Sequence, residues 1–273
     1  MLLNKTVIDE KLIIKKEVVK TFVFDLDGTI VYNGKPVDEK FNQLLLDIKD
    51  AGHQIIYATG RSFRDFIPVI PEWSVCQPSV VFGGGLVIAN DEIKFQQFID
   101  ESYLHEIIDF LEKNHVHYLV DGQSNFYHPS KEHWLYQDIV RLTGKVKAES
   151  AHHVICDGAY KILILDFEWL GHFQQYIIDK SLTIKCHFYD KCFDIMPANV
   201  NKYNGLSILS LPDPDNIYVF GNDQNDLELM QNLPNSIMLG HHQELSQYAK
   251  IQIPYNDDLF TNFKTVVNVI LGK

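Results

Sequence analysis

Residues 20–29 read Lys-Thr-Phe-Val-Phe-Asp-Leu-Asp-Gly-Thr, an apolar run that ends abruptly in two acidic residues. The run Lys20 to Phe24 has the composition of a short buried β-strand. Residues two apart in an extended segment point to the same side, so Asp25 and Asp27 reach one small volume at the strand end. Gly28 permits a sharp change of direction. An ordinary Asp-Gly turn would explain the motif alone, so the rest of the chain must decide between a turn and a site.

Strands and helices alternate around this stretch. Residues 54–58 and 79–82 are apolar strand-like runs, and apolar residues at helical spacing predict helices over 38–51 and 62–70. This alternation predicts a parallel sheet that is covered on both faces. The pattern resumes near the C-terminus, with helices over 202–211, 226–233 and 259–271 and strands over 217–220 and 236–239.

The middle of the chain, residues 84–197, has a different pattern. Residues 86–89 and 93–99 are expected to pair as a hairpin, and a helix stripe from Leu104 to Leu111 follows. Hairpins mixed with helices predict an antiparallel α+β unit. The predicted division is therefore a core domain of residues 1–83 and 198–273, interrupted by an inserted domain of residues 84–197. Residues 1–19 are expected to form an N-terminal extension with an extra strand or hairpin.

Composition narrows the classes of partner. The 273 residues carry a formal net charge of -12 and lack long basic runs, which argues against nucleic acid and anionic membranes as partners. No apolar run approaches the ~20 residues needed to span a bilayer, and the N-terminus lacks the features of a signal peptide. The four cysteines form no C-x-x-C pair and are expected to be reduced thiols. We therefore expect a cytoplasmic protein.

The paired acidic residues suggest a bound cation. Two carboxylates held close together repel each other unless a cation lies between them or one of them is protonated. Oxygen ligands combined with waters and substrate phosphate are what Mg²⁺ prefers. Such a cation would also supply the local positive charge that an acidic chain needs to bind an anionic substrate.

Three further segments strengthen this interpretation. They are Ile55–Arg61 (IIYATGR), Val200–Leu206 (VNKYNGL) and Phe220–Asp226 (FGNDQND), each at a strand end or a helix start. Together with Asp-x-Asp-Gly-Thr at residues 25–29, they resemble in order and spacing the four motifs of the haloacid dehalogenase superfamily. The arrangement is similar to the Cof-type phosphatases, whose large cap is inserted between the second and third motifs. The resemblance implies an α/β fold, with a Rossmann-like parallel-sheet core and an inserted α+β cap domain.

The resemblance also implies catalytic roles. Asp25 would attack phosphorus and form an aspartyl-phosphate, while Asp27 would act as general acid and then as general base. Thr59 and Lys202 would hold the phosphoryl oxygens. The substrate-binding residues implied are Thr59, Gly60, Arg61, Lys202 and Asn225.

A magnesium site is implied by the same resemblance. Its ligands would be the Asp25 carboxylate, the Asp27 main-chain carbonyl and the loop that carries Asn222, Asp223 and Asp226. The chain departs from the family here, because Asn222 stands where the motif has its first aspartate. Three interpretations are open: Asn222 binds through its amide oxygen, Asp223 takes its place, or metal affinity is reduced. Asp226 is expected to bind the metal through water or to orient Lys202.

The predicted function is a Mg²⁺-dependent phosphatase that hydrolyses a small phosphomonoester, such as a sugar phosphate or a similar metabolite. Two alternatives are open. A non-catalytic protein that binds a phosphorylated ligand is motivated by Asn222, and a phosphotransferase would pass through the same aspartyl-phosphate.

Overall fold

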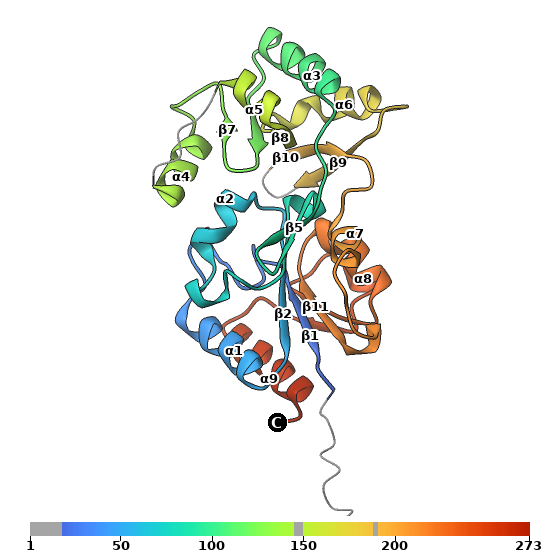
Figure 1. Ribbon diagram of the computed structural model, residues 1–273. Helices are drawn as coiled ribbons and strands as arrows, with labels where there is room; N and C mark the ends of the chain where they lie inside the picture. The colour runs from blue at the N-terminus through green and yellow to red at the C-terminus, as the bar shows by residue number, and fades with distance from the viewer. Residues whose placement is uncertain (1–17, 145–149, 188–190) are drawn as a thin grey trace, which may run out of the picture.

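The computed structural model describes residues 18–144, 150–187 and 191–273 and contains two separate sheets (Figure 1). The strand or hairpin expected before residue 20 falls on residues 1–17, which lie outside this range. No helix in the described ranges is long and apolar enough to cross a membrane.

The core sheet has eight strands in the described part of the chain, and those from β13 to β3 run parallel, as predicted. The chain order reverses at β1, because β1 lies between β11 and β2. Ligands of open α/β sheets bind at such a reversal, outside the carboxyl ends of the strands. In spatial order the strands are β13 (Ile251–Ile253), β12 (Asn235–Leu239), β11 (Ile217–Gly221), β1 (Thr21–Phe24), β2 (Gln54–Ala58), β3 (Ser79–Val81), β4 (Leu86–Ala89) and β5 (Glu92–Gln96).

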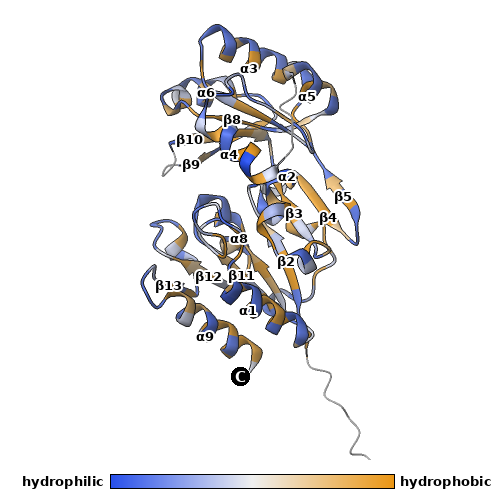
Figure 2. Cartoon of the chain, turned by 90° about the vertical axis from the view of Figure 1, so that its left-hand side faces the viewer, coloured by the Kyte–Doolittle hydropathy of each residue, from blue (hydrophilic) through white to orange (hydrophobic). Residues whose placement is uncertain are grey.

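Side chains of β1 alternate between the two faces of the sheet. Phe22 and Phe24 pack in the cluster that includes helices α1 (Glu39–Asp50) and α9 (Leu259–Leu271), whereas Val23 packs with α7 (Lys202–Ser207) and α8 (Leu227–Asn232). Figure 1 shows these two helix pairs on opposite sides of β1, and Figure 2 shows apolar residues concentrated along the strands between them. Each buried phenylalanine contributes about 1.5–3 kcal/mol. Because alternate side chains of β1 point to opposite faces, this strand packs against both helix layers.

Most predicted helices form, with boundaries set by local chemistry. Asp38 caps α1, its side chain accepting from the main-chain N–H of Phe41 at 2.9 Å. The helix predicted over 62–70 is a short α2 (Phe63–Phe66) followed by the 3₁₀ turn η1 (Ile67–Val69). The helix predicted over 202–211 ends early, at Ser207.

The predicted hairpin belongs to the core sheet. It forms as β4 and β5, but β4 also pairs antiparallel with β3, with Ser79 opposite Ile88. The physical cause is the 3₁₀ turn η3 (Phe82–Gly84), where Gly84 has a φ of 112° and the chain folds back along β3. This pairing moves the start of the inserted unit from residue 84 to a point after Gln96. We propose a core of residues 18–96 and 198–273, and call residues 97–197 the cap unit.

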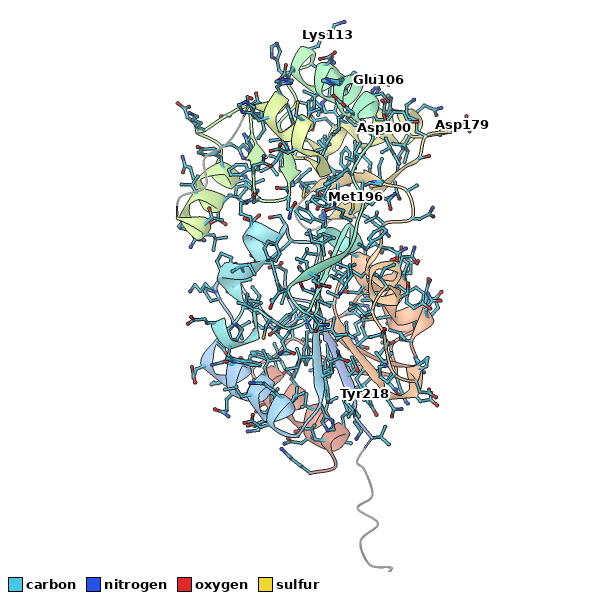
Figure 3. The ribbon with its side chains drawn as sticks, viewed as in Figure 1. Asp100, Glu106, Lys113, Asp179, Met196 and Tyr218 are labelled. Carbon is cyan, nitrogen blue, oxygen red and sulfur yellow. The ribbon has the colours of Figure 1, made fainter. Side chains whose placement is uncertain are left out.

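The cap unit is an antiparallel α+β structure, as predicted. Its sheet has five strands among the described residues, in the order β7-β6-β8-β10-β9. Helices α3, α5 and α6 pack on one face, and α4 on the other. Figure 3 shows Met196, near the end of β10, between the cap unit and the core, while Asp100, Glu106, Lys113 and Asp179 lie far from that junction. The elements are α3 (Glu101–Lys113), β6 (Tyr118–Gly122), β7 (Phe126–Tyr127), α4 (Trp134–Thr143), α5 (Ala151–Asp157), β8 (Ala159–Ile164), α6 (Leu170–Tyr176), β9 (Leu182–His187) and β10 (Cys192–Pro197).

The start of α7 is held against the turn that follows β3. A Cβ on Gly84 would lie 2.2 Å from the main-chain oxygen of Asn201, and one on Gly205 would lie 2.6 Å from Cγ1 of Val80. Only glycine permits backbones to approach this closely. This contact fixes the position of Lys202, the first residue of α7.

Replacing Gly84 with alanine is expected to destabilise the fold by about 2–4 kcal/mol, because the new methyl group adds a clash to an unfavourable φ. Urea unfolding measures this loss. The control is Gly34→Ala. Gly34 also has a positive φ, of 63°, but a Cβ added there would meet no atom within 4 Å. The Gly34→Ala variant is therefore expected to lose only about 1 kcal/mol of stability. Equal losses for the two variants would contradict the close-contact explanation.

Candidate active site

A buried ammonium group lies at the centre of the site. Lys202 Nζ donates to Asp25 Oδ1 at 2.6 Å, to Asp226 Oδ1 at 2.7 Å and to Asn225 Oδ1 at 2.8 Å. The three bonds use all three protons of the ammonium group. Three segments that are far apart in sequence thus meet at one atom: the end of β1, the start of α7 and the loop after β11.

The charges in this cluster do not balance. Asp25 is 4% exposed, Asp226 0% and Lys202 1%, so one cation serves two buried carboxylates. Burial raises the pKa of Asp25 to about 7, although Lys202 opposes the rise. Burial alone would lower the pKa of Lys202, but Asp226 and Asp25 outweigh it, and that pKa lies above its ordinary value. Lys202 therefore stays protonated. Because one ammonium group serves two carboxylates, a further positive charge beside Asp25 would be favourable.

The second oxygen of Asp25 lies beside Thr29 and the Asn222 amide. Asp25 Oδ2 accepts from Thr29 Oγ1 at 3.2 Å. One end of the Asn222 amide lies 3.1 Å from Asp25 Oδ2 and 2.9 Å from the main-chain oxygen of Asp27. No cluster of three or more His, Cys, Asp or Glu side chains able to hold a metal is found among the described residues. The converging donors are instead one carboxylate, one carbonyl and one amide, an oxygen set of the kind that suits Mg²⁺.

Two other predicted metal ligands are engaged with the chain itself. Asp226 Oδ2 accepts from the main-chain N–H of Asn222 at 2.9 Å and of Asp223 at 3.2 Å, while Oδ1 accepts from Lys202. The Asp223 side chain accepts from the main-chain N–H of Asp226 in a reciprocal cap. Asp226 thus contacts Lys202 and the main chain of its own loop, and Asn222 is the loop side chain that reaches Asp25.

The second predicted motif lies beside the first. Thr59 is buried directly after β2, and its Oγ1 accepts from the main-chain N–H of Arg61 at 3.1 Å. Arg61 donates two hydrogen bonds to the Asp27 carboxylate, from Nε to Oδ2 at 2.7 Å and from Nη2 to Oδ1 at 2.6 Å. Gly60 lies next to Asn225, since a Cβ there would be 3.5 Å from its amide nitrogen. All five predicted substrate-binding residues therefore belong to one connected cluster.

A pocket between the core and the cap unit adjoins this cluster. Its free volume is about 20 Å³, close to the room that a single water needs. The cap unit contributes charged and polar side chains that the sequence did not single out, notably Lys185, His187 and Asp194. Asp194 is an acidic residue inside an apolar strand, a signal that could have found it. The lining residues are Gly60, Phe82, Gly83, Lys185, His187, Asp194, Met196, Asn201 and Asn225.

Asp194 organises the polar wall of this pocket. Its Oδ2 lies 2.9 Å from His187 Nε2, and its Oδ1 lies 3.2 Å from Lys161 Nζ. Burial alone would lower the pKa of His187, but Asp194 outweighs it and the pKa is raised. The imidazole therefore carries positive charge over a wider pH range than an exposed histidine does.

Three basic side chains are among those that tie the cap unit to the core. Arg64 on α2 donates to Asp121 Oδ1 at 2.9 Å and to the main-chain oxygen of Asn125 at 3.1 Å, and its guanidinium lies over the Phe126 ring. Lys161 donates to the main-chain oxygen of Gly60 at 3.2 Å. Lys185 pairs with Glu228 on α8. Arg64 therefore joins the core to the cap unit.

The structure thus combines a parallel sheet, the buried carboxylates of Asp25 and Asp226 at its switch point, and a separate α+β unit above them. A family model for haloacid dehalogenase-like hydrolases matches residues 22–259, and the chain belongs to this family, in its Cof-type branch. The predicted family is thus confirmed.

Known relatives share this fold at low sequence identity. A Bacillus subtilis protein named 5-amino-6-(5-phospho-D-ribitylamino)uracil phosphatase is 21% identical, over 80% of this chain and 85% of its own. A haloacid dehalogenase-like hydrolase from Bacteroides thetaiotaomicron superposes with a TM-score of 0.78 at 16% identity, covering 93% of this chain and all of the other. A sugar phosphatase of haloacid dehalogenase subclass IIB superposes with a TM-score of 0.74 at 14% sequence identity. The match covers 92% of this chain and 98% of the other.

Replacing Lys202 with methionine is expected to cost about 3–5 kcal/mol of unfolding free energy at pH 7, because two buried carboxylates lose their cation. Urea unfolding in the presence of a chelator measures the loss. The loss should shrink as pH falls, since protonation removes the unpaired charges. The control, Lys94→Met, removes an exposed partner of Glu92 and should change stability by less than about 1 kcal/mol. A small, pH-independent loss for Lys202→Met would contradict this account.

Proposed function

We propose that the chain is a Mg²⁺-dependent phosphatase that hydrolyses a small phosphomonoester through an aspartyl-phosphate on Asp25. The observation that carries the proposal is the environment of Asp25. One of its oxygens is held by Lys202, and the other lies beside the Asn222 amide, which also approaches the Asp27 main-chain carbonyl. The carboxylate, the amide and the carbonyl can each offer Mg²⁺ an oxygen. When bound there by Asp25, Asn222 and the Asp27 carbonyl, Mg²⁺ would offset the repulsion between the carboxylate and a phosphate.

The first half-reaction forms the covalent intermediate. An oxygen of Asp25 attacks phosphorus, the bond from phosphorus to the ester oxygen breaks, and Asp27 gives a proton to the departing oxygen. Lys202 and the Thr59 hydroxyl stabilise charge on the transferring group. Both Asp27 oxygens accept from Arg61 in this conformation. A phosphate that attracts Arg61 would free Asp27 for proton transfer.

The second half-reaction restores the enzyme. A water attacks phosphorus, the bond between phosphorus and Asp25 breaks, and Asp27 takes the proton from that water. Transfer to a sugar hydroxyl would follow the same steps with another acceptor. We favour water as the acceptor, because the relatives of this chain are named phosphatases.

The substrate class follows from the cap wall. Lys185, His187 and Asp194 offer donors and acceptors suited to the hydroxyl groups of a leaving alcohol, while Phe82 and Met196 supply an apolar side. This composition supports a sugar phosphate or a similar polyhydroxylated metabolite. The named activities of the relatives, on a phosphoribityl compound and on sugar phosphates, support the same class.

Asp25→Asn is expected to reduce Mg²⁺-dependent phosphate release from an aryl phosphate to the uncatalysed background, because the amide is a poor nucleophile. Free phosphate is assayed with and without a chelator. Asp50→Asn alters an exposed carboxylate at the end of α1 and should keep full activity. Turnover that survives in Asp25→Asn would rule out the covalent route, and tight ligand binding without turnover by the natural chain would favour the non-catalytic alternative.

His187→Gln tests the role of the cap wall. Loss of the imidazole should lower kcat/KM for sugar phosphates roughly tenfold, which corresponds to the loss of one charged hydrogen bond. The kcat/KM for an aryl phosphate should change by less than about twofold. A panel of phosphorylated metabolites provides the comparison. His105→Gln, on an exposed position of α3, is the control. A uniform loss on all substrates would indicate a structural effect instead of a contact with the leaving group.

A further inference from the structure

Tyr255, in the segment between β13 and α9, lies against the loop that follows β1. Its hydroxyl donates to the main-chain oxygen of Gly28 at 2.6 Å and lies 3.2 Å from one end of the Asn222 amide. The ring occupies a place that a side chain at Gly240 would fill, because a Cβ there would lie 2.3 Å from Cε2 of Tyr255. A Cβ on Gly28 would likewise lie 2.2 Å from the Asn222 amide. Two glycines thus make room for a tyrosine–asparagine pair at the site.

Counting protons indicates which end of the Asn222 amide meets Tyr255. A hydroxyl has a single proton, and a carbonyl oxygen has none. The 2.6 Å contact with Gly28 O therefore uses the Tyr255 proton, and the hydroxyl presents a lone pair toward Asn222. The group that suits a lone pair is the amide NH₂. The amide oxygen then points the other way, 3.1 Å from Asp25 Oδ2 and 2.9 Å from the Asp27 carbonyl.

The reversed amide would have the opposite effect on a cation. With NH₂ turned inward, Asn222 would donate to Asp25 Oδ2 and to the Asp27 carbonyl, and its oxygen would accept from Tyr255 at 3.2 Å. That orientation satisfies the two inner oxygens with a donor, so it competes with a metal ion for them. It also requires Tyr255 to surrender its shorter bond to Gly28.

We propose that Tyr255 is a positioning residue that holds the Asn222 amide with its oxygen toward Asp25 and Asp27, so that a neutral amide serves as a metal ligand. The inference rests on the Mg²⁺ site of the proposed function. A carboxylate presents an oxygen at either end and needs no such support. The requirement for Tyr255 therefore belongs to a loop that carries asparagine at position 222.

The test is a double-mutant cycle on metal binding, with Mn²⁺ as the probe in place of Mg²⁺. Affinity is measured by titration with detection of free Mn²⁺, without substrate. Tyr255→Phe should weaken binding roughly three- to tenfold, the value of one hydrogen bond. Asn222→Asp should strengthen it by about tenfold or more, because it adds a charge to the ligand set. In the Asn222→Asp background, Tyr255→Phe should change affinity by less than about twofold.

Three results would overturn the inference. Equal weakening by Tyr255→Phe in both backgrounds would mean that the hydroxyl acts only through the Gly28 loop. No weakening in the natural background would mean that it does not orient the amide. Unchanged affinity in Asn222→Asp would mean that residue 222 is not a ligand. Tyr248→Phe, at an exposed tyrosine on the core, is the control for loss of a hydroxyl.

One further variant separates this inference from the function on which it rests. Asp25→Asn should abolish Mn²⁺ binding if the site is where we place it. Absence of Mn²⁺ binding by the natural chain would overturn the metal site itself, and the role of Tyr255 with it. Metal binding that depends on Asp25 but ignores Tyr255 would leave the proposed phosphatase intact and overturn only the positioning role.

Discussion

The bonds between Lys202 and the carboxylates of Asp25 and Asp226 are the constraint on which the site depends. A buried ammonium group with three acceptors cannot move without leaving charges unpaired in a region from which water is excluded. The groups are delivered by β1, by the start of α7 and by the loop after β11, so the sheet order and the packing of Gly84 against Asn201 are prerequisites of the cluster. The fold is arranged so that one strand end, one helix start and one loop coincide.

The excess negative charge of this cluster connects structure with chemistry. One lysine offsets one carboxylate, and burial makes the remainder costly, which is why the pKa of Asp25 is raised. In the function we propose, the same imbalance would attract a cation to the far side of Asp25. The interior charge that would weaken an ordinary core would then supply affinity for a metal and, through the metal, for a phosphate.

Most helices and strands of the core, and the polar residues at the strand ends, could be predicted from sequence, because they depend on neighbouring residues in the chain. The strand at Lys20–Phe24, the helix over 259–271 and the polar residues at strand ends follow from periodicity and from the topology of parallel sheets. The hairpin predicted over residues 86–89 and 93–99 forms as β4 and β5, but its place in the core sheet was not predicted. Its strands can pair with each other on either unit, and only the turn at Phe82–Gly84 decides which sheet they join.

Other features depend on contacts between distant residues. Tyr255 reaches Gly28 across 227 positions, and no spacing rule connects them. Lys185, His187 and Asp194 meet the active site only because the cap unit docks on the core. The approach of Arg64 to Asp121 arises in the same way. Such residues look like ordinary polar positions in a strand or a loop until the tertiary structure brings them together.

The pocket lies between the two units, so the way in which the cap unit packs on the core sets the room available beside Asp25. A change in that packing would widen or narrow the space for a substrate in the function we propose. Arg64 and its partners Asp121, Asn125 and Phe126 join the two units at this junction. In the proposed function, the strength of these contacts would therefore affect how long a bound molecule stays beside Asp25.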